Sequence, residues 1–378
     1  MKVELPEPDA DAKAASRELS RRIADRIAAD GGWIPFVHYM DLALHMPGLG
    51  YYGGGSRKFG VEGDFVTAPE LTPLFGQSLA RQVRQVIDQS APVVLEVGAG
   101  SGRLAADLLA CLSIDRYYIL ELSGELRARQ MQTLAAALPD WQDRVEWLDT
   151  LPEQFSGCVV ANELLDAMPV HAVAWRSDGL MERGVVCAAD GFAWAERPAS
   201  QTLAAAMTDL PVSAPYQSEL GLVAAGWISE WGRRLQTGAL LLIDYGLPRH
   251  EYYHHGRNCG TLRCHYRQRS HDDPFWWPGL SDITAHVDFT AMAEAGYAAG
   301  LDVLGYTNQA SFLINCGLAQ LLDSRRQADV VGGQRAGAAA QVLLSLNEMG
   351  ELFKVIALGK GIKEPMHGFL MGDRTHTL

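Results

Sequence analysis

Residues 94–102 read VLEVGAGSG, an apolar run that carries a single acid, Glu96, and ends in three glycines. A glycine-rich turn between a strand and a helix lets the backbone approach a nucleotide and directs helix N–H groups toward it. The glycines Gly98, Gly100 and Gly102 have the spacing G-x-G-x-G, whereas a dinucleotide fold uses G-x-G-x-x-G. The turn alone therefore leaves a purely structural role open.

The segments around this turn predict a parallel sheet. Apolar runs of strand length lie at 93–97, 116–122, 144–148, 157–164 and 238–246, and helical patterns lie at 104–112 and 123–138. The runs are apolar throughout, which is typical of strands covered on both faces. Their order predicts an α/β fold with a mostly parallel, doubly wound, Rossmann-like sheet.

The rest of the chain predicts helices and short β elements around that sheet. Residues 9–30 have the one-face apolar spacing of an amphipathic helix. Residues 33–64 are rich in aromatic residues and glycine, so we expect a structured loop region that forms a cover. We expect a hairpin within 171–186, helices at 203–210, 216–220, 222–235, 290–299 and within 310–349, and a last strand at 352–358.

We expect one elaborated α/β domain, because no linker or internal repeat interrupts the chain. Residues 1–75 are predicted to form an N-terminal helix and lid segment. Residues 76–310 are predicted to form the core, with helical and β insertions around 170–235 and 247–290. Residues 311–378 add C-terminal helices and the strand at 352–358, which returns to the core sheet.

The composition predicts a folded, acidic protein. Hydrophobic residues make up 48% of the chain and charged residues 20%, which is near the globular average. The formal charge is −13 at pH 7, so we expect no binding to nucleic acid or to an anionic membrane. The acidic N-terminal residues lack the apolar core of a secretory signal, so we expect a bacterial protein of the cytoplasm.

The segment 250–279 combines histidines, two cysteines and several arginines. A metal site is the weaker interpretation, because the spacing of Cys259, Cys264 and His265 is not a regular zinc spacing, and we expect no metal. We interpret the segment as a basic, aromatic loop that contacts a protein substrate. A solvated face and a weak nucleic-acid patch are the alternatives.

Two acids narrow the choice of ligand. Glu96 lies two residues before Gly98, where a carboxylate would repel a pyrophosphate but could accept a hydrogen bond from an ammonium or a bound water. Glu121 ends the next predicted strand, where a carboxylate can accept both hydroxyls of a ribose. A ligand with a ribose, a positive charge and no phosphate fits best, and S-adenosylmethionine has that description.

Longer motifs extend this interpretation. They are GDFVTAPELTPLFGQ (63–77), LEVGAGSG (95–102), ANELLDAMPVH (161–171), LLIDYG (241–246), GTLRCHYRQR (260–269), SDITAHVDF (281–289) and MGELFKVIALGKG (349–361). Together they resemble the MidA family of class I methyltransferases over nearly the whole chain. The resemblance implies S-adenosylmethionine as the cofactor. Mitochondrial members are complex I assembly factors that act as protein arginine methyltransferases, so it also implies a partner protein's arginine as the substrate.

Candidate catalytic residues follow the predicted strand at 157–164. By resemblance, Asn162, Glu163 and Asp166 belong to the motif that faces the transferred methyl group. A site for a guanidinium needs carboxylates that accept paired hydrogen bonds from it. Glu163 and Asp166 could supply them, since they share one face if the turn is helical. His286 and Asp288 are further candidates for substrate contact or proton removal, and helix capping is the alternative for Asp288.

Candidate cofactor-binding residues come from the glycine turn, the two strand ends beside it and the lid segment. They are Glu96, Gly98, Ala99, Gly100, Gly102, Glu121, Leu122, Asn162, Thr67, Pro69 and Glu70. By resemblance, the lid segment closes over the site. The structural alternative is that Thr67 caps the following helix, Pro69 lies in its first turn and Glu70 completes a capping box.

Other functions remain open from the sequence. A non-catalytic assembly factor would use the same fold as a docking surface. An NAD-dependent dehydrogenase conflicts with the glycine spacing and with Glu96, and methylation of nucleic acid conflicts with the negative charge. The oligomeric state is open as well, with a homodimer as one option.

Overall fold

The structure is a computed structural model that describes residues 5–54 and 67–378. The predicted lid motif, which begins at residue 63, therefore lies partly outside the described residues. The chain divides into two compact units. The large unit comprises residues 66–164, 225–246 and 289–378, and the small unit comprises residues 1–65, 165–224 and 247–288. The last two segments of the small unit overlap the insertions expected around 170–235 and 247–290.

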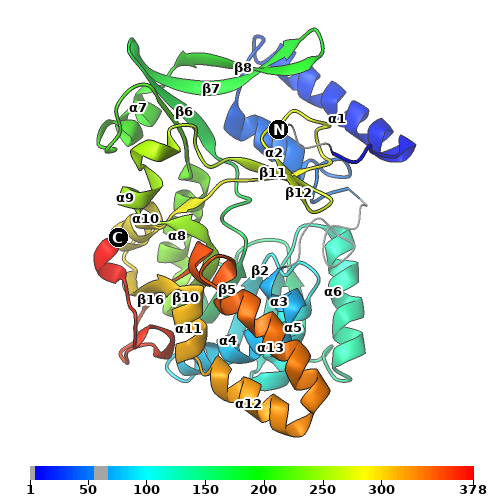
Figure 1. The fold of residues 1–378 in the computed structure, drawn as a ribbon, viewed down its shortest axis with the longest axis vertical. Coiled ribbons are helices and arrows are strands. Elements are labelled where there is room, and N and C mark those ends of the chain that lie inside the picture. The colour runs from blue at the N-terminus through cyan, green and yellow to red at the C-terminus, as the bar shows by residue number, and fades with distance from the viewer. Residues whose placement is uncertain (1–4, 55–66) are drawn as a thin grey trace. The chain divides into compact units, whose positions relative to one another are not determined.

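The large unit is built on one mixed sheet (Figure 1). Its strands are β2 (Val93–Val97), β3 (Arg116–Leu120), β4 (Val145–Leu148), β5 (Phe155–Asn162), β10 (Leu235–Leu247), β15 (Asp302–Asn308) and β16 (Phe353–Lys360), in the spatial order β15-β16-β10-β5-β2-β3-β4. The strands from β10 to β4 are parallel, whereas β16 is antiparallel to both β10 and β15. The prediction of a mostly parallel, Rossmann-like sheet is confirmed.

The chain reverses its direction across this sheet at β2. From β2 it continues to β3 and β4 on one side, and it then returns to β5 and β10 on the other side. Ligands of such sheets bind outside the carboxyl ends of the strands at the point of reversal. The fold therefore places the candidate site at the carboxyl ends of β2, β3 and β5.

Helices pack around the large sheet, and all of those named next except α10 contribute apolar residues to one core with the central strands. They are α3 (Ala68–Leu71), α4 (Pro73–Ile87), α5 (Arg103–Cys111), α6 (Gly124–Ala137), α10 (Phe289–Ala298), α11 (Gln309–Asn315), α12 (Leu318–Ala328), α13 (Val330–Leu344) and α14 (Met349–Leu352). Helix α8 (Leu222–Arg234) spans the sequence boundary between the units. Strand residues such as Val94 and Leu241 have no exposed surface, which explains why these runs are apolar throughout.

Two glutamines of α4, together with Gln89 two residues beyond its end, hold the C-terminal segment of the large unit. The side-chain oxygens of Gln82, Gln85 and Gln89 accept hydrogen bonds from the backbone N–H groups of Gly368 (2.7 Å), His367 (2.8 Å), and Lys363 and Glu364 (both 3.1 Å). The segment also contains the short 3₁₀ helices His367–Phe369 and Thr375–Thr377. Side-chain amides on and just after one helix therefore satisfy backbone N–H groups of this segment.

The small unit contains two further sheets. Their strands are β1 (Ile34–Pro35), β6 (His171–Arg176), β7 (Gly179–Ala188), β8 (Gly191–Pro198), β9 (Tyr216–Leu220), β11 (Arg263–Tyr266), β12 (Arg269–His271) and β13 (Asp282–Thr284). The short strand β14 (Val287–Asp288) belongs to neither of these two sheets. The first sheet has the order β1-β7-β6-β9 with β8 paired to β7, and the second has the order β12-β11-β13. The expected hairpin is the β6–β7 pair, in which Arg176 faces Gly179 across a two-residue turn.

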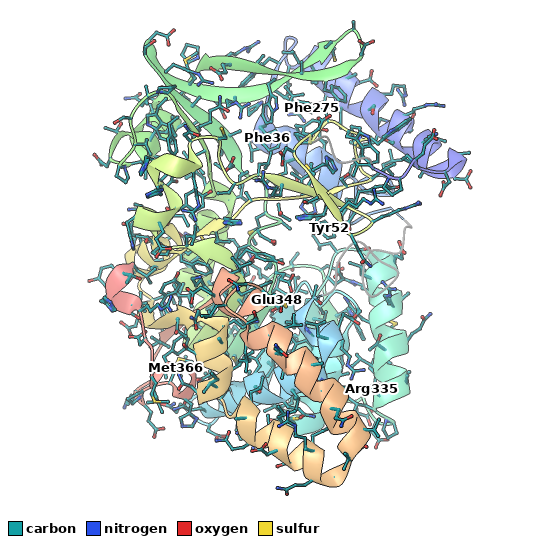
Figure 2. All side chains as sticks on the ribbon, in the orientation of Figure 1. Phe36, Tyr52, Phe275, Arg335, Glu348 and Met366 are labelled. Carbon is teal, nitrogen blue, oxygen red and sulfur yellow. The ribbon has the colours of Figure 1, made fainter. Side chains whose placement is uncertain are left out.

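The helices of the small unit are α1 (Ala10–Ala29), α2 (Phe36–His45), α7 (Gln201–Thr208) and α9 (Arg249–Tyr252), with one 3₁₀ turn at His255–Arg257. An aromatic cluster joins α2 to β8 and to the loop after β12. Trp194 contacts both Phe36, at 4.7 Å between ring centroids, and Phe275, at 5.1 Å, and the latter two are labelled in Figure 2. Ring packing thus contributes to the core of this unit.

Two predictions of secondary structure are wrong. Residues 216–220 were expected to be helical, but they form β9, because their backbone pairs with β6 in an antiparallel register. Residues 33–64 were expected to form loop structure, but the described part contains the helix α2. Most residues of α2 are buried, so it lacks the polar face that would reveal a helix in the sequence.

A glycine contact between parallel strands predicts a stability effect. A Cβ at Gly238 would lie 1.8 Å from the carbonyl oxygen of Gly157 on the neighbouring strand, and the φ of Gly238 is +138°. We expect Gly238→Ala to lower the free energy of unfolding by about 2 kcal/mol or more. Gly226→Ala is the control, because a Cβ there has open space within a helix, and we expect it to stabilise by about 0.5–1 kcal/mol. Equal melting temperatures for the two variants would contradict this account.

Candidate active site

The glycine turn connects β2 to α5 with three backbone conformations that favour glycine. Gly98, Gly100 and Gly102 have φ angles of +72°, +51° and +81°. The N–H of Gly98 donates to the carbonyl of Leu120 at the end of β3, at 3.1 Å. The turn is therefore joined to the neighbouring strand end, and Ala99 within it is buried in the core.

Glu96 is a buried carboxylate in β2 with an exposed fraction of 3%. The hydroxyl of Tyr117 on β3 donates to Glu96 Oε2 at 2.6 Å. Burial raises the pKa of the Glu96 carboxyl to about 7, the charge of Glu121 acts in the same direction, and the hydrogen bond from Tyr117 opposes both. A cationic ligand group beside Glu96 would favour its ionised form.

Glu121 directly follows β3 and has an exposed fraction of 8%. Its Oε1 accepts a hydrogen bond from the N–H of Ser123 at 2.9 Å, and its Oε2 accepts one from Nε2 of Gln130 at 3.1 Å. Burial raises the pKa of Glu121, and these hydrogen bonds oppose that shift. The next side chain, Leu122, is 80% exposed, so an apolar surface lies directly after this carboxylate in the chain.

The lid residues lie at the short helix α3. Thr67 is the residue before its first turn and Pro69 lies within that turn, but the Thr67 side chain makes no capping hydrogen bond. The carboxylate of Glu70 accepts a hydrogen bond from Ser101 Oγ in the glycine turn instead of completing a capping box. The side-chain cap belongs to Thr72, which accepts from the N–H of Leu74 at the start of α4. The alternative in which the Thr67 side chain caps this helix is therefore wrong, because that side chain makes no capping hydrogen bond.

Asn162 and Glu163 end β5 with linked side chains. Asn162 Nδ2 donates to Glu163 Oε1 at 2.9 Å, while Asn162 Oδ1 is buried and has no hydrogen-bond partner among the described residues. Glu163 has a φ of +53°, and its N–H donates to the carbonyl of Ile243 on β10 at 2.9 Å. The left-handed backbone of Glu163 excludes a helical turn, so the condition under which Glu163 and Asp166 share a helix face is not met.

The remaining catalytic candidates belong to the small unit. Asp166 is buried with an exposed fraction of 5%, and its carbonyl accepts from the N–H of Ala285 at 3.0 Å, next to His286. The N–H of His286 donates to Thr261 Oγ1 at 3.0 Å. Asp288 directly precedes the first residue of α10, and its carboxylate lies 3.5 Å from Arg249 Nε. An ion pair is thus a further role for Asp288, besides capping and substrate contact.

Two contributors near the glycine turn were missed from the sequence. Tyr117 supports Glu96, and Gln130 on α6 contacts both Glu121 and the carbonyl of Gly100. Tyr117 lies on a strand and Gln130 on an amphipathic helix, at positions that ordinary core residues also occupy. Only their three-dimensional neighbours distinguish them, so no motif signal could have found them.

Comparison with known proteins identifies the family. A family model described as "Putative S-adenosyl-L-methionine-dependent methyltransferase" matches residues 74–307. The chain belongs to this family. The match covers more than half of the chain, including the glycine turn and the ends of β3 and β5. It confirms the predicted methyltransferase activity and S-adenosylmethionine as its cofactor.

Solved structures and curated proteins agree with the family. A crystal structure of a Burkholderia thailandensis protein bound to S-adenosyl-homocysteine is 50% identical, with a TM-score of 0.96 over 99% of this chain and 100% of that one. A Drosophila melanogaster protein named protein arginine methyltransferase NDUFAF7 homolog, mitochondrial, is 28% identical over 97% of this chain and 92% of its own length. Its Homo sapiens counterpart is 28% identical over 86% and 80%.

No described helix is both long and apolar enough to cross a membrane. Within residues 5–54 and 67–378, no cluster of three or more His, Cys, Asp or Glu side chains has an arrangement suited to a metal ion. The segment 250–279 instead supplies β11, in which Cys264 is buried, and β12, whereas Cys259 precedes both strands and is exposed.

The pKa of Glu96 predicts how ligand affinity depends on pH. With a pKa of about 7, Glu96 is mostly protonated at pH 6 and mostly ionised at pH 8 in the free protein. An ammonium of the ligand pairs with the ionised form only, so binding lowers this pKa and releases a proton near neutral pH. We expect the affinity for S-adenosylhomocysteine to rise up to about tenfold from pH 6 to pH 8, as measured by calorimetric titration.

The control for this prediction is Glu96→Gln, which keeps the shape of the side chain and removes its titration. Its affinity should be lower at pH 8 and nearly constant between pH 6 and pH 8. An unchanged pH profile in this variant would show that another group titrates, and Glu96 would then have no contact with the ligand ammonium.

Proposed function

We propose that this chain transfers a methyl group from S-adenosylmethionine to an arginine side chain of a partner protein. The observation that carries the proposal is the end of β5, where Asn162 and Glu163 combine an amide, a carboxylate and a backbone conformation that is rare outside glycine. Such conformations cost about 1–3 kcal/mol and cluster at functional sites. The relatives named protein arginine methyltransferase support the class of acceptor.

The proposed cofactor site uses the carboxyl ends of β2 and β3. Glu121 would accept the ribose hydroxyls, since an ionised carboxylate has about four acceptor sites and the hydrogen bonds from Ser123 and Gln130 leave capacity free. Glu96 would lie near the ammonium of the ligand, and exposed Leu122 would offer an apolar surface to the adenine. The backbone of Gly98, Ala99, Gly100 and Gly102 would line the amino acid part, with Thr67, Pro69 and Glu70 as the lid.

The residues present fit this ligand. Two buried carboxylates with pKa values raised by burial suit a ligand that brings a positive charge and hydroxyl donors. The buried Oδ1 of Asn162, a candidate for contact with both the cofactor and the acceptor, suits an N–H donor that the described residues do not supply. When bound, S-adenosylmethionine supplies a methyl carbon attached to a sulfonium. The sulfur is the leaving group and becomes a neutral thioether.

The proposed mechanism requires the chain to orient and neutralise the acceptor. Glu163 would pair with the guanidinium and hold one of its nitrogens toward the methyl carbon, while Asn162 Oδ1 would accept an N–H of the same group. A new N–C bond forms, the C–S bond breaks, and the attacking nitrogen loses a proton. Asp166, His286 and Asp288 are the proposed groups for substrate contact and for taking up that proton.

The experiment that tests this proposal is methyl transfer from radiolabelled S-adenosylmethionine to candidate proteins, followed by acid hydrolysis and separation of methylarginines. The resemblance to the MidA family makes respiratory complex I subunits the first acceptors to test. We expect Glu163→Gln to lower the transfer rate at least about a hundredfold, since the oriented carboxylate acts on the reacting group. Affinity for S-adenosylhomocysteine should remain within about threefold, because Glu163 is assigned to the acceptor.

The matched control is Glu146→Gln, which removes an exposed carboxylate from β4 of the same sheet and should leave the transfer rate unchanged. Label in lysine or in nucleic acid, with none in arginine, would contradict the proposed acceptor. Full biological function in Glu163→Gln would favour the docking-factor alternative over a role in catalysis.

A further inference from the structure

The side chain of Gln130 connects three parts of the candidate cofactor site. It lies on α6 and has no exposed surface. Its Nε2 donates to the carbonyl of Gly100 and to Oε2 of Glu121, both at 3.1 Å, and its Oε1 accepts from the indole N–H of Trp147 on β4 at 2.8 Å. One buried amide therefore bridges the glycine turn, the carboxylate after β3 and the last strand of the sheet.

The direction of this amide follows from the chemistry of its partners. The indole N–H of Trp147 can only donate, so the amide oxygen must face it. The carbonyl of Gly100 can only accept, and the ionised carboxylate of Glu121 likewise accepts, so the amide nitrogen must face both. In a flipped amide, the oxygen would face two acceptors and the NH₂ group would face the indole N–H, which would then have no acceptor. The observed orientation is therefore the favoured one.

The backbone of α6 also contacts the glycine turn at this residue. A Cβ at Gly102 would lie 3.0 Å from Gln130 Cα and 3.3 Å from its Cβ. The absence of a side chain at Gly102 thus lets α6 approach closely enough for the amide to reach both of its acceptors. The close approach limits where Gln130 can move, so the hydrogen bond to Glu121 has a defined direction.

We propose that Gln130 is a positioning residue that holds the Glu121 carboxylate in the orientation that accepts the ribose hydroxyls of the cofactor. This inference rests on the proposed function, because it requires Glu121 to bind the ribose. Ser123 N–H holds one carboxylate oxygen from the backbone and Gln130 holds the other from a side chain. Without Gln130, Oε2 loses its donor, and the carboxylate can rotate away from the hydroxyls.

The test is a double-mutant cycle measured by calorimetric titration with S-adenosylhomocysteine. We expect Gln130→Leu to weaken binding about tenfold or more, since a hydrogen bond to a charged group is lost. In the Glu121→Ala background, Gln130→Leu should lower the affinity for S-adenosylhomocysteine by less than about twofold, because the group that Gln130 positions is already absent. An S-adenosylhomocysteine analogue that lacks the 2′ and 3′ hydroxyls gives a second test. The affinities of the wild type and of Gln130→Leu for this analogue should differ by less than about twofold.

A matched control separates positioning from general loss of stability. Gln82 is another fully buried amide of the large unit, which donates to Gln85 Oε1 at 2.9 Å and accepts from the N–H of Gly368 at 2.7 Å. Gln82→Leu should lower the melting temperature to a similar extent as Gln130→Leu. Its affinity for S-adenosylhomocysteine should stay within about twofold of the wild type, because Gln82 contacts the C-terminal segment instead.

A second variant keeps the test decisive if Gln130→Leu does not fold. Trp147→Phe removes the indole N–H that fixes the amide, together with part of the aromatic ring, and it should weaken binding by about threefold for the ligand with hydroxyls and not for the analogue. An equal loss of affinity on Gln130→Leu in both backgrounds and with both ligands would overturn the positioning role of Gln130. It would not contradict the proposed cofactor site. No binding by the folded wild type would overturn the proposed cofactor site itself.

Discussion

The parallel pairing of β2 with both β3 and β5 is the constraint on which the candidate site depends. Because the three strands run in the same direction, their carboxyl ends lie at one edge of the sheet. The register pairs Glu96 with Ile119 on one side and with Val160 on the other, close to where Glu121 and Asn162 follow. Residues that are distant in the chain thereby reach one edge, where the reversal of the strand order leaves room for a ligand.

Burial of negative charge at this edge accounts for the choice of ligand. Burying a carboxylate is costly unless donors or cations compensate for the lost water. Tyr117 donates to Glu96, and Ser123 and Gln130 donate to Glu121, yet burial still raises both pKa values. A cationic ligand with hydroxyl donors lowers this cost, whereas a pyrophosphate would raise it. The same electrostatic argument explains why the glycine turn in this chain differs from that of a dinucleotide fold.

The sequence predicted the features that depend on local pattern. The central strands are apolar because both faces are covered, and the glycine turn requires left-handed backbone, so both leave a direct signal. The strand β9 and the helix α2 could not be predicted, since pairing with β6 and burial among aromatic rings override their local pattern. In the site, the acids and glycines were found, but Tyr117 and Gln130 were not, because their roles exist only through contacts between separate elements.

The most direct test of the central claim is a crystal structure of this protein with S-adenosylhomocysteine bound. The account predicts ribose hydroxyls within hydrogen-bond distance of both oxygens of Glu121, with the ligand ammonium near Glu96 and the glycine turn. Gln130 should keep its contacts with Glu121 and Trp147 in that complex. A ligand seated away from the carboxyl ends of β2 and β3, or a ribose that does not contact Glu121, would contradict it.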